Sequence, residues 1–175
     1  KKACIKNKKN KLITLKKRYG HNASIQTGFD FVSKKNYTVV IDCDLQDQPE
    51  LIAKNFSKIK AEQTIHFVRK KREDPFFQKF YTNIAYLVLH FISEGKIIMN
   101  SSHFKIIPPH VVRKIKKNTE IHPYWNYLFT QLSLKNKIVY YVKKKRKMVV
   151  LKSSKTALYR LRQEIREMSN MFLMR

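Results

Sequence analysis

The sequence has few cysteines, few glycines and few acidic residues. Its 175 residues include two cysteines, Cys4 and Cys43, too few for a disulfide framework, and no Cys-x-x-Cys or Cys/His spacing typical of zinc sites. Three glycines are too few for a Gly-rich phosphate loop, and no Walker or dinucleotide-binding motif occurs. These absences argue against a zinc protein and a P-loop, and they favour a reducing compartment.

Long apolar runs are also missing. The longest dense apolar stretch, residues 84–92, has about half of the roughly 20 residues that a membrane-spanning helix needs. Neither a spanning helix nor a signal peptide is therefore expected in this chain. The chain begins at Lys1 rather than at Met, which fits a fragment or a processed piece as well as a complete protein.

Positive charge dominates what is present. The 38 Lys and Arg residues outnumber the 12 Asp and Glu residues, so the formal net charge is +26 at pH 7. Such a chain is attracted to phosphates, anionic lipids and nucleic acids. No DNA- or RNA-binding motif is present, so we expect no specific recognition of nucleic acid. The 43% of apolar residues are typical of a globular domain with its own core.

Short apolar runs with strand character alternate with apolar residues at helical spacing. Strands are predicted at residues 12–15, 37–41, 64–68, 102–107 and 137–142, and helices at 25–32, from 49 to 59, at 77–88, from 108, at 124–134 and at 157–172. The run at 37–41 is rich in β-branched residues and continuous enough to be buried on both faces. The alternation predicts an α/β fold with a mostly parallel sheet flanked by helices.

Four of the twelve acidic residues lie within nine positions, directly after the strand predicted at 37–41. Ligands bind at this edge in open α/β sheets. Asp42 and Asp44 repel each other unless a cation lies between them, and hard oxygen ligands suit Mg²⁺ or Mn²⁺ shared with substrate phosphates. Gln46 adds a neutral oxygen ligand. In the alternative interpretation, Asp42 and Asp44 are loop residues neutralised by a nearby Lys.

The run from Asp47 to Glu50 has the pattern of a helix start. Asp47 can cap the helix, Pro49 fits its first turn, and Glu50 stands at the reciprocal position of a capping box. Capping is therefore favoured over a catalytic role for Asp47, and both interpretations stay open.

The wider run resembles a known family signature. Residues 42–50, Asp-Cys-Asp-Leu-Gln-Asp-Gln-Pro-Glu, closely resemble the Asp-x-Asp-Leu-Gln-Asp-x-Pro-Glu signature of family 2 glycosyltransferases, in the branch that loads sugars onto polyprenyl (dolichyl or undecaprenyl) phosphate. Residues 18–29 are similar to the Asn-Phe-Gly-His segment that precedes it in the family, and residues 68–74 to the strand-end Arg and the Arg-Glu-Asp that follow. The motifs occur in family order over roughly residues 12–160.

The resemblance implies a partial GT-A (Rossmann-like) fold and an inverting hexosyltransferase. A nucleotide sugar would be held with Mg²⁺ or Mn²⁺, and its sugar passed to a polyprenyl-phosphate lipid at the cytoplasmic face of the cell membrane, against an anionic membrane surface. Asp44 and Gln46 match the metal-coordinating positions, and Asp42 matches the first acid of the motif. A metal ion would stabilise the leaving diphosphate.

The basic residues of the later motifs are expected to bind substrate phosphates. Arg69 and Arg72 match the family's phosphate-binding region, where a planar guanidinium suits diphosphate, and Lys155 belongs to a surviving Ser-Ser-Lys. Lys105 replaces the Arg of the family's Gly-Asp-Phe-Arg-Leu segment. The alternative for the charged run at 69–72 is a solvated surface loop.

Two histidines stand at motif positions. His103 replaces the Asp of the same segment and is a candidate base, since imidazole accepts protons near neutral pH. A partly exposed strand histidine is the slightly favoured alternative for His103. For His21, a structural and a functional role are about equally supported.

The resemblance also defines what the chain lacks. Nothing before Lys11 is similar to the first two strands of the family, which hold the nucleotide. We therefore expect an N-terminally truncated catalytic domain over residues 1–152, followed by a basic amphipathic helix over 153–175 that could lie at a membrane interface. The alternatives are a non-catalytic remnant or partner subunit and, from charge alone, a basic nucleic-acid-binding protein. A homo-oligomer remains an open alternative.

Overall fold

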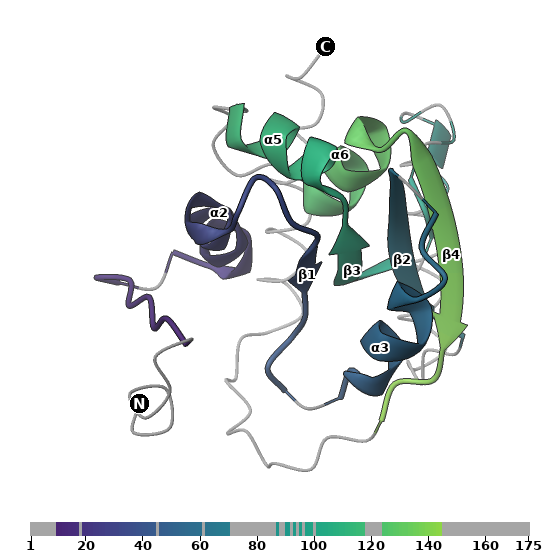
Figure 1. Cartoon of the computed structure of the whole chain (residues 1–175), viewed down its shortest axis with the longest axis horizontal. Helices are drawn as coiled ribbons and strands as arrows, with labels where there is room; N and C mark the ends of the chain where they lie inside the picture. Colours follow the sequence, from purple (N-terminus) through teal and green to yellow (C-terminus); the bar gives the residue numbers. More distant parts are fainter. Residues whose placement is uncertain are drawn as a thin grey trace.

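Helices and strands are interspersed along the computed structural model (Figure 1). It describes residues 10–144 except 18, 45, 61, 71–86, 88–89, 92, 94, 96, 100 and 118–123. The elements are α2 (His21–Phe31), β1 (Thr38–Val40), α3 (Glu50–Phe56), β2 (Gln63–Arg69), β3 (Ser101–Ile107), α5 (Pro109–Lys117), α6 (Trp125–Leu132) and β4 (Lys135–Tyr141).

The four strands form one mixed sheet in the order β1-β3-β2-β4. Strand β3 is antiparallel to both of its neighbours, whereas β4 is parallel to β2. The predicted α/β class with flanking helices is confirmed, but in the described part of the sheet most pairings are antiparallel. The sequence could not show this, because a central antiparallel strand is buried on both faces and therefore has the same apolar pattern as a parallel one.

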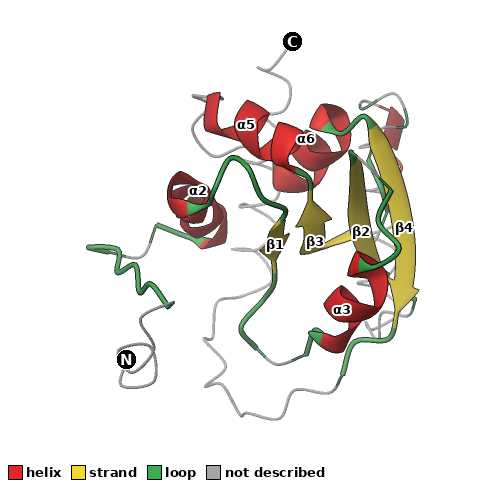
Figure 2. Cartoon of the chain, viewed as in Figure 1, coloured by secondary structure: helices red, strands yellow, loops and turns green. Residues whose placement is uncertain are grey.

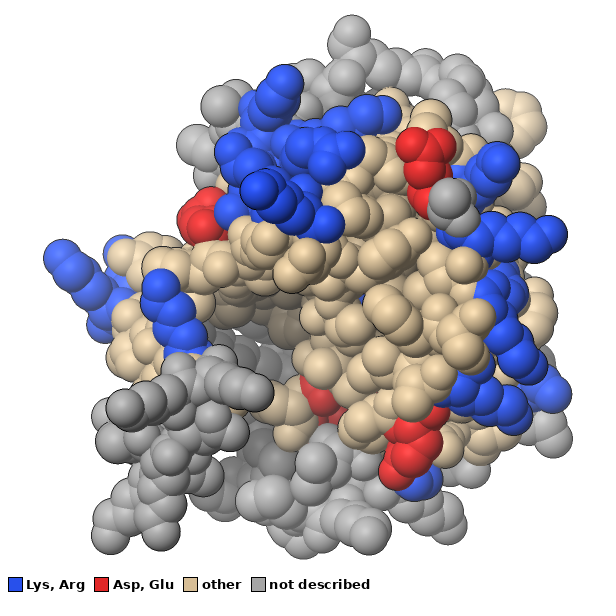
Figure 3. Space-filling model, viewed as in Figure 1, with Lys and Arg blue, Asp and Glu red and all other residues tan. Residues whose placement is uncertain are grey.

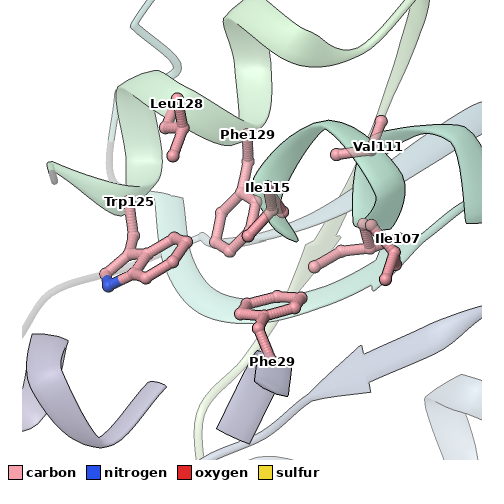
Figure 4. Close-up of a cluster of buried hydrophobic side chains, with 8 residues drawn as sticks. Phe29, Ile107, Val111, Ile115, Trp125, Leu128 and Phe129 are labelled. Atoms are coloured by element: carbon pink, nitrogen blue, oxygen red, sulfur yellow. The ribbon is translucent and has the colours of Figure 1, made fainter. Parts of the chain in front are cut away.

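Helices cover both faces of the sheet. On one face, Ile107 of β3 packs with buried side chains of α2, α5 and α6, including Phe29, Ile115 and Trp125 (Figure 4). On the other face, β2 and β3 pack against Leu51 and Ile52 of α3, which lies apart from the other three helices (Figure 2). Because side chains alternate along a strand, β3 contributes to both clusters, with Ile107 in the first and Phe104 and Ile106 in the second.

Most of the predicted elements are confirmed in the described residues. One is wrong, since residues 12–15 form no strand. Another is shorter than predicted: β1 has three residues, all only partly buried, because within the described sheet it pairs with β3 alone. The residues that defined the helix predicted at 77–88, and the helix predicted at 157–172, lie outside the described residues. No described helix is both long and apolar enough to cross a membrane.

Candidate functional site

The predicted site residues meet at one edge of the sheet. Strands β1, β2 and β4 end at the edge where β3 begins, because β3 runs in the opposite direction. Asp42 follows the end of β1, Arg69 ends β2, and His103 is the third residue of β3. We call residues 42–47 the acidic loop. The mixed topology therefore gathers at one edge residues that lie far apart in the sequence.

The acidic loop is fastened to the segment that follows β4. The backbone N–H of Lys144 donates to the carbonyl of Gln46 at 3.0 Å, and the side-chain amide of Gln46 donates to the carbonyl of Lys144 at 3.1 Å. Gln48 adds a 2.9 Å bond to the carbonyl of Val142. Within the loop, the N–H of Gln46 donates to a carboxylate oxygen of Asp44 at 3.1 Å, a turn that Asp forms readily. The loop is thereby held in place by the segment that follows β4.

Asp47 is the buried member of the loop. Its side chain is fully buried, and Oδ1 accepts a 2.5 Å hydrogen bond from the hydroxyl of Tyr141. Helix α3 begins only at Glu50 and has no side-chain cap, so the prediction that Asp47 caps it is wrong. The physical reason is that a buried carboxylate needs a buried donor, and Tyr141 supplies one. Burial and the bond to Asp47 both raise the pKa of Tyr141.

Lys143 lies among three carboxylates. Its Nζ is 3.5 Å from Asp44 Oδ2, 4.0 Å from Asp42 Oδ2 and 4.0 Å from Asp47 Oδ1. Sequence reasoning missed this residue because it lies in a run of lysines. Its position could have indicated a role at the site. Lys143 follows the end of β4 closely, and Arg69 ends β2, the strand beside it.

The predicted metal ligands do not fit a metal ion in this arrangement. Mg²⁺ needs oxygen ligands at about 2.1 Å, whereas an ammonium group stands between Asp42 and Asp44 with its nitrogen 3.5–4.0 Å from their oxygens. The Gln46 side chain is held against the segment after β4, since its Nε2 donates to the carbonyl of Lys144. Within the described ranges, no three His, Cys, Asp or Glu side chains are grouped to hold a metal ion. The geometry matches the alternative of carboxylates neutralised by a nearby Lys.

Two histidines border the acidic loop. His21 Nε2 donates to Asp42 Oδ1 at 3.2 Å, and this bond lowers the pKa of Asp42. The ring of His103 meets that of His21 edge to face, with centroids 4.6 Å apart. Burial is the main cause that lowers the pKa of His103 to about 4, and the nearby cationic groups His21 and Lys105 add to it. His103 is therefore neutral near pH 7 and able to accept a hydrogen bond, although its low pKa makes it a weak base.

Arg69 faces the same edge from the end of β2. It stands opposite Tyr141 in the β2–β4 register, and its positive charge contributes to lowering the pKa of His103. Its Nε is buried and has no hydrogen-bond partner among the described residues. A buried guanidinium N–H without a partner is suited to an anionic ligand, since leaving such a donor unpaired is costly.

Lys105 of β3 lies inside the protein rather than at its surface. Its side chain is fully buried, and Nζ donates to Ser101 Oγ at 2.5 Å and to the carbonyl of Ser102 at 2.8 Å. Burial lowers its pKa to about 7. Because its side chain is fully buried and its Nζ already has two acceptors, Lys105 is not placed to bind a phosphate from solvent. The other two predicted phosphate ligands, Arg72 and Lys155, lie outside the described residues.

Comparison with known proteins gives a consistent result. Residues 1–122 match the family model described as Glycosyl transferase family 2. The chain is similar to the uncharacterized glycosyltransferase YkcC of Bacillus subtilis (strain 168), with 31% identity over 138 residues, covering 78% of this chain and 42% of that protein. It is also similar to the uncharacterized glycosyltransferase sll0501 of Synechocystis sp. (strain ATCC 27184 / PCC 6803 / Kazusa), with 27% identity over 135 residues, covering 76% of this chain and 42% of the relative. The chain thus spans about two fifths of the length of these curated relatives.

Proposed function

Because this chain belongs to glycosyl transferase family 2, we propose that it is the part of a sugar transferase that holds the phosphates of a nucleotide-sugar donor. The observation that carries the proposal is the meeting of the acidic loop, Arg69 and His103 at the edge where β1, β2 and β4 end. Ligands of open α/β sheets bind at this edge. The proposed reaction breaks the bond between the anomeric carbon of a hexose and the diphosphate. It then forms a bond to an acceptor oxygen with inversion.

Each residue of the edge has a proposed role. Arg69, whose Nε has no partner within the described part of the chain, binds the diphosphate, where a guanidinium can pair with two oxygens at once. His103, neutral at pH 7, accepts a hydrogen bond from the bound substrates and so helps to orient them. His21 orients Asp42 through their hydrogen bond. Asp47 is a positioning residue, because its carboxylate is buried and bonded to Tyr141.

The family resemblance suggests a Mg²⁺ or Mn²⁺ ion, but the arrangement of Asp42 and Asp44 around the Lys143 ammonium group does not fit one. The proposed roles therefore rest on the side chains alone. Arg69 at the end of β2 and Lys143 beside the acidic loop are cations at this edge. Both can reduce the negative charge that develops on a leaving diphosphate.

We propose that the acceptor is a polyprenyl phosphate at the cytoplasmic face of a membrane. The formal net charge of +26 supports attraction to an anionic surface. Lys and Arg side chains gather over α5, whose last turn contains Lys114, Lys116 and Lys117 (Figure 3). Flotation of the chain with neutral and with anionic vesicles tests this point. We expect flotation with anionic vesicles only, and failure to float with either kind would contradict the proposed attachment.

Transfer of radiolabelled sugar from a panel of nucleotide sugars to polyprenyl phosphate tests the enzymatic proposal. We expect one donor to support transfer. Asp44→Ala should lower the rate about tenfold or more, which corresponds to about 1.4 kcal/mol, because it removes the carboxylate that lies nearest to Lys143 at the edge that holds the donor. The control is Asp30→Ala, which removes an exposed acid of α2 outside the site. Donor binding without transfer would favour the non-catalytic alternative. Absence of both would reject the proposal for this chain.

A further inference from the structure

We infer that Lys143 is the resident counter-ion of the acidic loop, and that a divalent cation can bind there only by displacing it. The three carboxylates of Asp42, Asp44 and Asp47 converge on its Nζ. Without a cation, three carboxylates so close together would repel one another. The ammonium group supplies the positive charge that the loop requires.

Lys143 is held in this place by the backbone. The two hydrogen bonds between Gln46 and Lys144 join the acidic loop to the residue next to Lys143. The Lys143 side chain is only 17% exposed, whereas Lys144 beside it is an exposed residue. A surface lysine usually pairs weakly and changes partners freely. The fold instead holds the Nζ of Lys143 within 4.0 Å of three carboxylates.

The spacing around Lys143 suits an ammonium group and excludes a metal ion at the same point. Distances of 3.5–4.0 Å are those of an ion pair with nitrogen, whereas a divalent ion would draw the oxygens to about 2.1 Å. An ammonium group and a divalent ion in the same loop repel each other strongly at this distance. Metal affinity is therefore reduced by the cost of moving Lys143. This concerns cation binding alone and holds whether or not the chain transfers sugar.

Titration with Mn²⁺, following the free ion by electron paramagnetic resonance, tests the inference directly. The chain is compared with Lys143→Met, which keeps the length of the side chain and removes its charge. We expect Lys143→Met to bind Mn²⁺ roughly tenfold more tightly or better, because a unit positive charge within 4.0 Å of the ligands is gone. The matched control is Lys144→Met, which removes the same charge from the exposed neighbour. It should leave the affinity unchanged.

Two further variants test whether a gain in Mn²⁺ affinity arises at the acidic loop. Lys143→Arg keeps the charge and should bind Mn²⁺ as weakly as the unmodified chain. Asp44→Asn added to Lys143→Met should lose the gain. Equal affinities for the chain and Lys143→Met, or an equal gain in Lys144→Met, would overturn the inference.

A stability measurement covers the case in which Lys143→Met folds poorly. Three unneutralised carboxylates should lower its melting temperature, and Mn²⁺ should raise it far more than it raises that of the unmodified chain, since a ligand stabilises the state that binds it. A variant that Mn²⁺ does not stabilise would contradict the inference. None of these measurements uses a sugar donor. Failure of sugar transfer and failure of this inference are therefore distinguishable.

Discussion

The hydroxyl of Tyr141, the last residue of β4, donates a 2.5 Å hydrogen bond to Asp47 Oδ1, 94 positions earlier in the sequence. Both side chains are buried. The bond joins the acidic loop after β1 to the far strand of the described sheet, which is β4. The shape of the loop thus depends on β4 having docked beside β2.

Replacing Tyr141 with Phe should destabilise the protein by about 1–3 kcal/mol, because it leaves a buried carboxylate without its hydrogen-bond donor. Denaturant unfolding followed by circular dichroism measures this loss. Tyr140→Phe is the matched control, since Tyr140 is 60% exposed and should change stability by no more than about 0.5 kcal/mol. Equal effects of the two substitutions would show that the bond to Asp47 contributes nothing.

Trp125→Phe should loosen the helix that carries His21. Buried Trp125 stacks on Phe29 and donates from Nε1 to the carbonyl of Asn22 in the first turn of α2. We expect a loss of about 1–3 kcal/mol from the missing bond and the smaller ring. The NMR signals of the His21 ring should shift as well. The exposed Gln131 on the same helix provides a control, and Gln131→Ala should alter neither quantity.

Lys105 should make the protein more stable as the pH rises from 7 to 9. Burial lowers its pKa to about 7, from an ordinary value of 10.5. Between these values the unfolded chain holds a proton that the folded chain has released, so the free energy of unfolding increases with pH, on the order of 1 kcal/mol per pH unit. Chemical denaturation at several pH values measures the slope. Lys105→Met should abolish it, while Lys117→Met at the end of α5 should preserve it.

His66 should make the protein sensitive to acid. Its ring is buried in β2 with Nε2 2.7 Å from Asn136 Oδ1, and burial is the main cause that lowers its pKa from 6.5 to about 3. Below pH 6.5 His66 binds a proton in the unfolded chain, whereas in the folded chain it stays neutral until the pH approaches 3. Stability therefore falls as the pH decreases toward 3, on the order of 1 kcal/mol per pH unit. His103, with a pKa of about 4, acts in the same direction. His66→Gln should reduce the slope measured by acid titration, and an unchanged slope would contradict this assignment.

Arg69→Gln should weaken the binding of a nucleoside diphosphate about tenfold, as expected when a charge-assisted hydrogen bond is lost. Isothermal titration calorimetry with UDP and GDP measures the change. Arg113→Gln removes the same charge from α5, where the exposed guanidinium donates to the carbonyl of Lys34 at 3.2 Å. That control should bind as the unmodified chain does. An equal loss in both variants would point to general charge attraction rather than to a site at Arg69.

Local patterns explain what could be predicted. Strands β2, β3 and β4 and helices α2, α3, α5 and α6 follow from apolar spacing within short segments, and they were expected close to their observed positions. The acidic loop was expected at the end of β1 because the acids follow an apolar run directly. Family membership could be predicted from residues 42–50, which include this loop, since their motif is nine residues long and unbroken.

The sequence by itself therefore determined the family, most of the elements and the edge at which the acidic loop lies. Only the tertiary structure decided what the side chains contact. The reversed direction of β3, the burial of Lys105, the bond from Tyr141 to Asp47 and the place of Lys143 among three acids all depend on the order of strands in the sheet. That order brings together residues about a hundred positions apart, and no local pattern records which distant partner will neutralise a given charge.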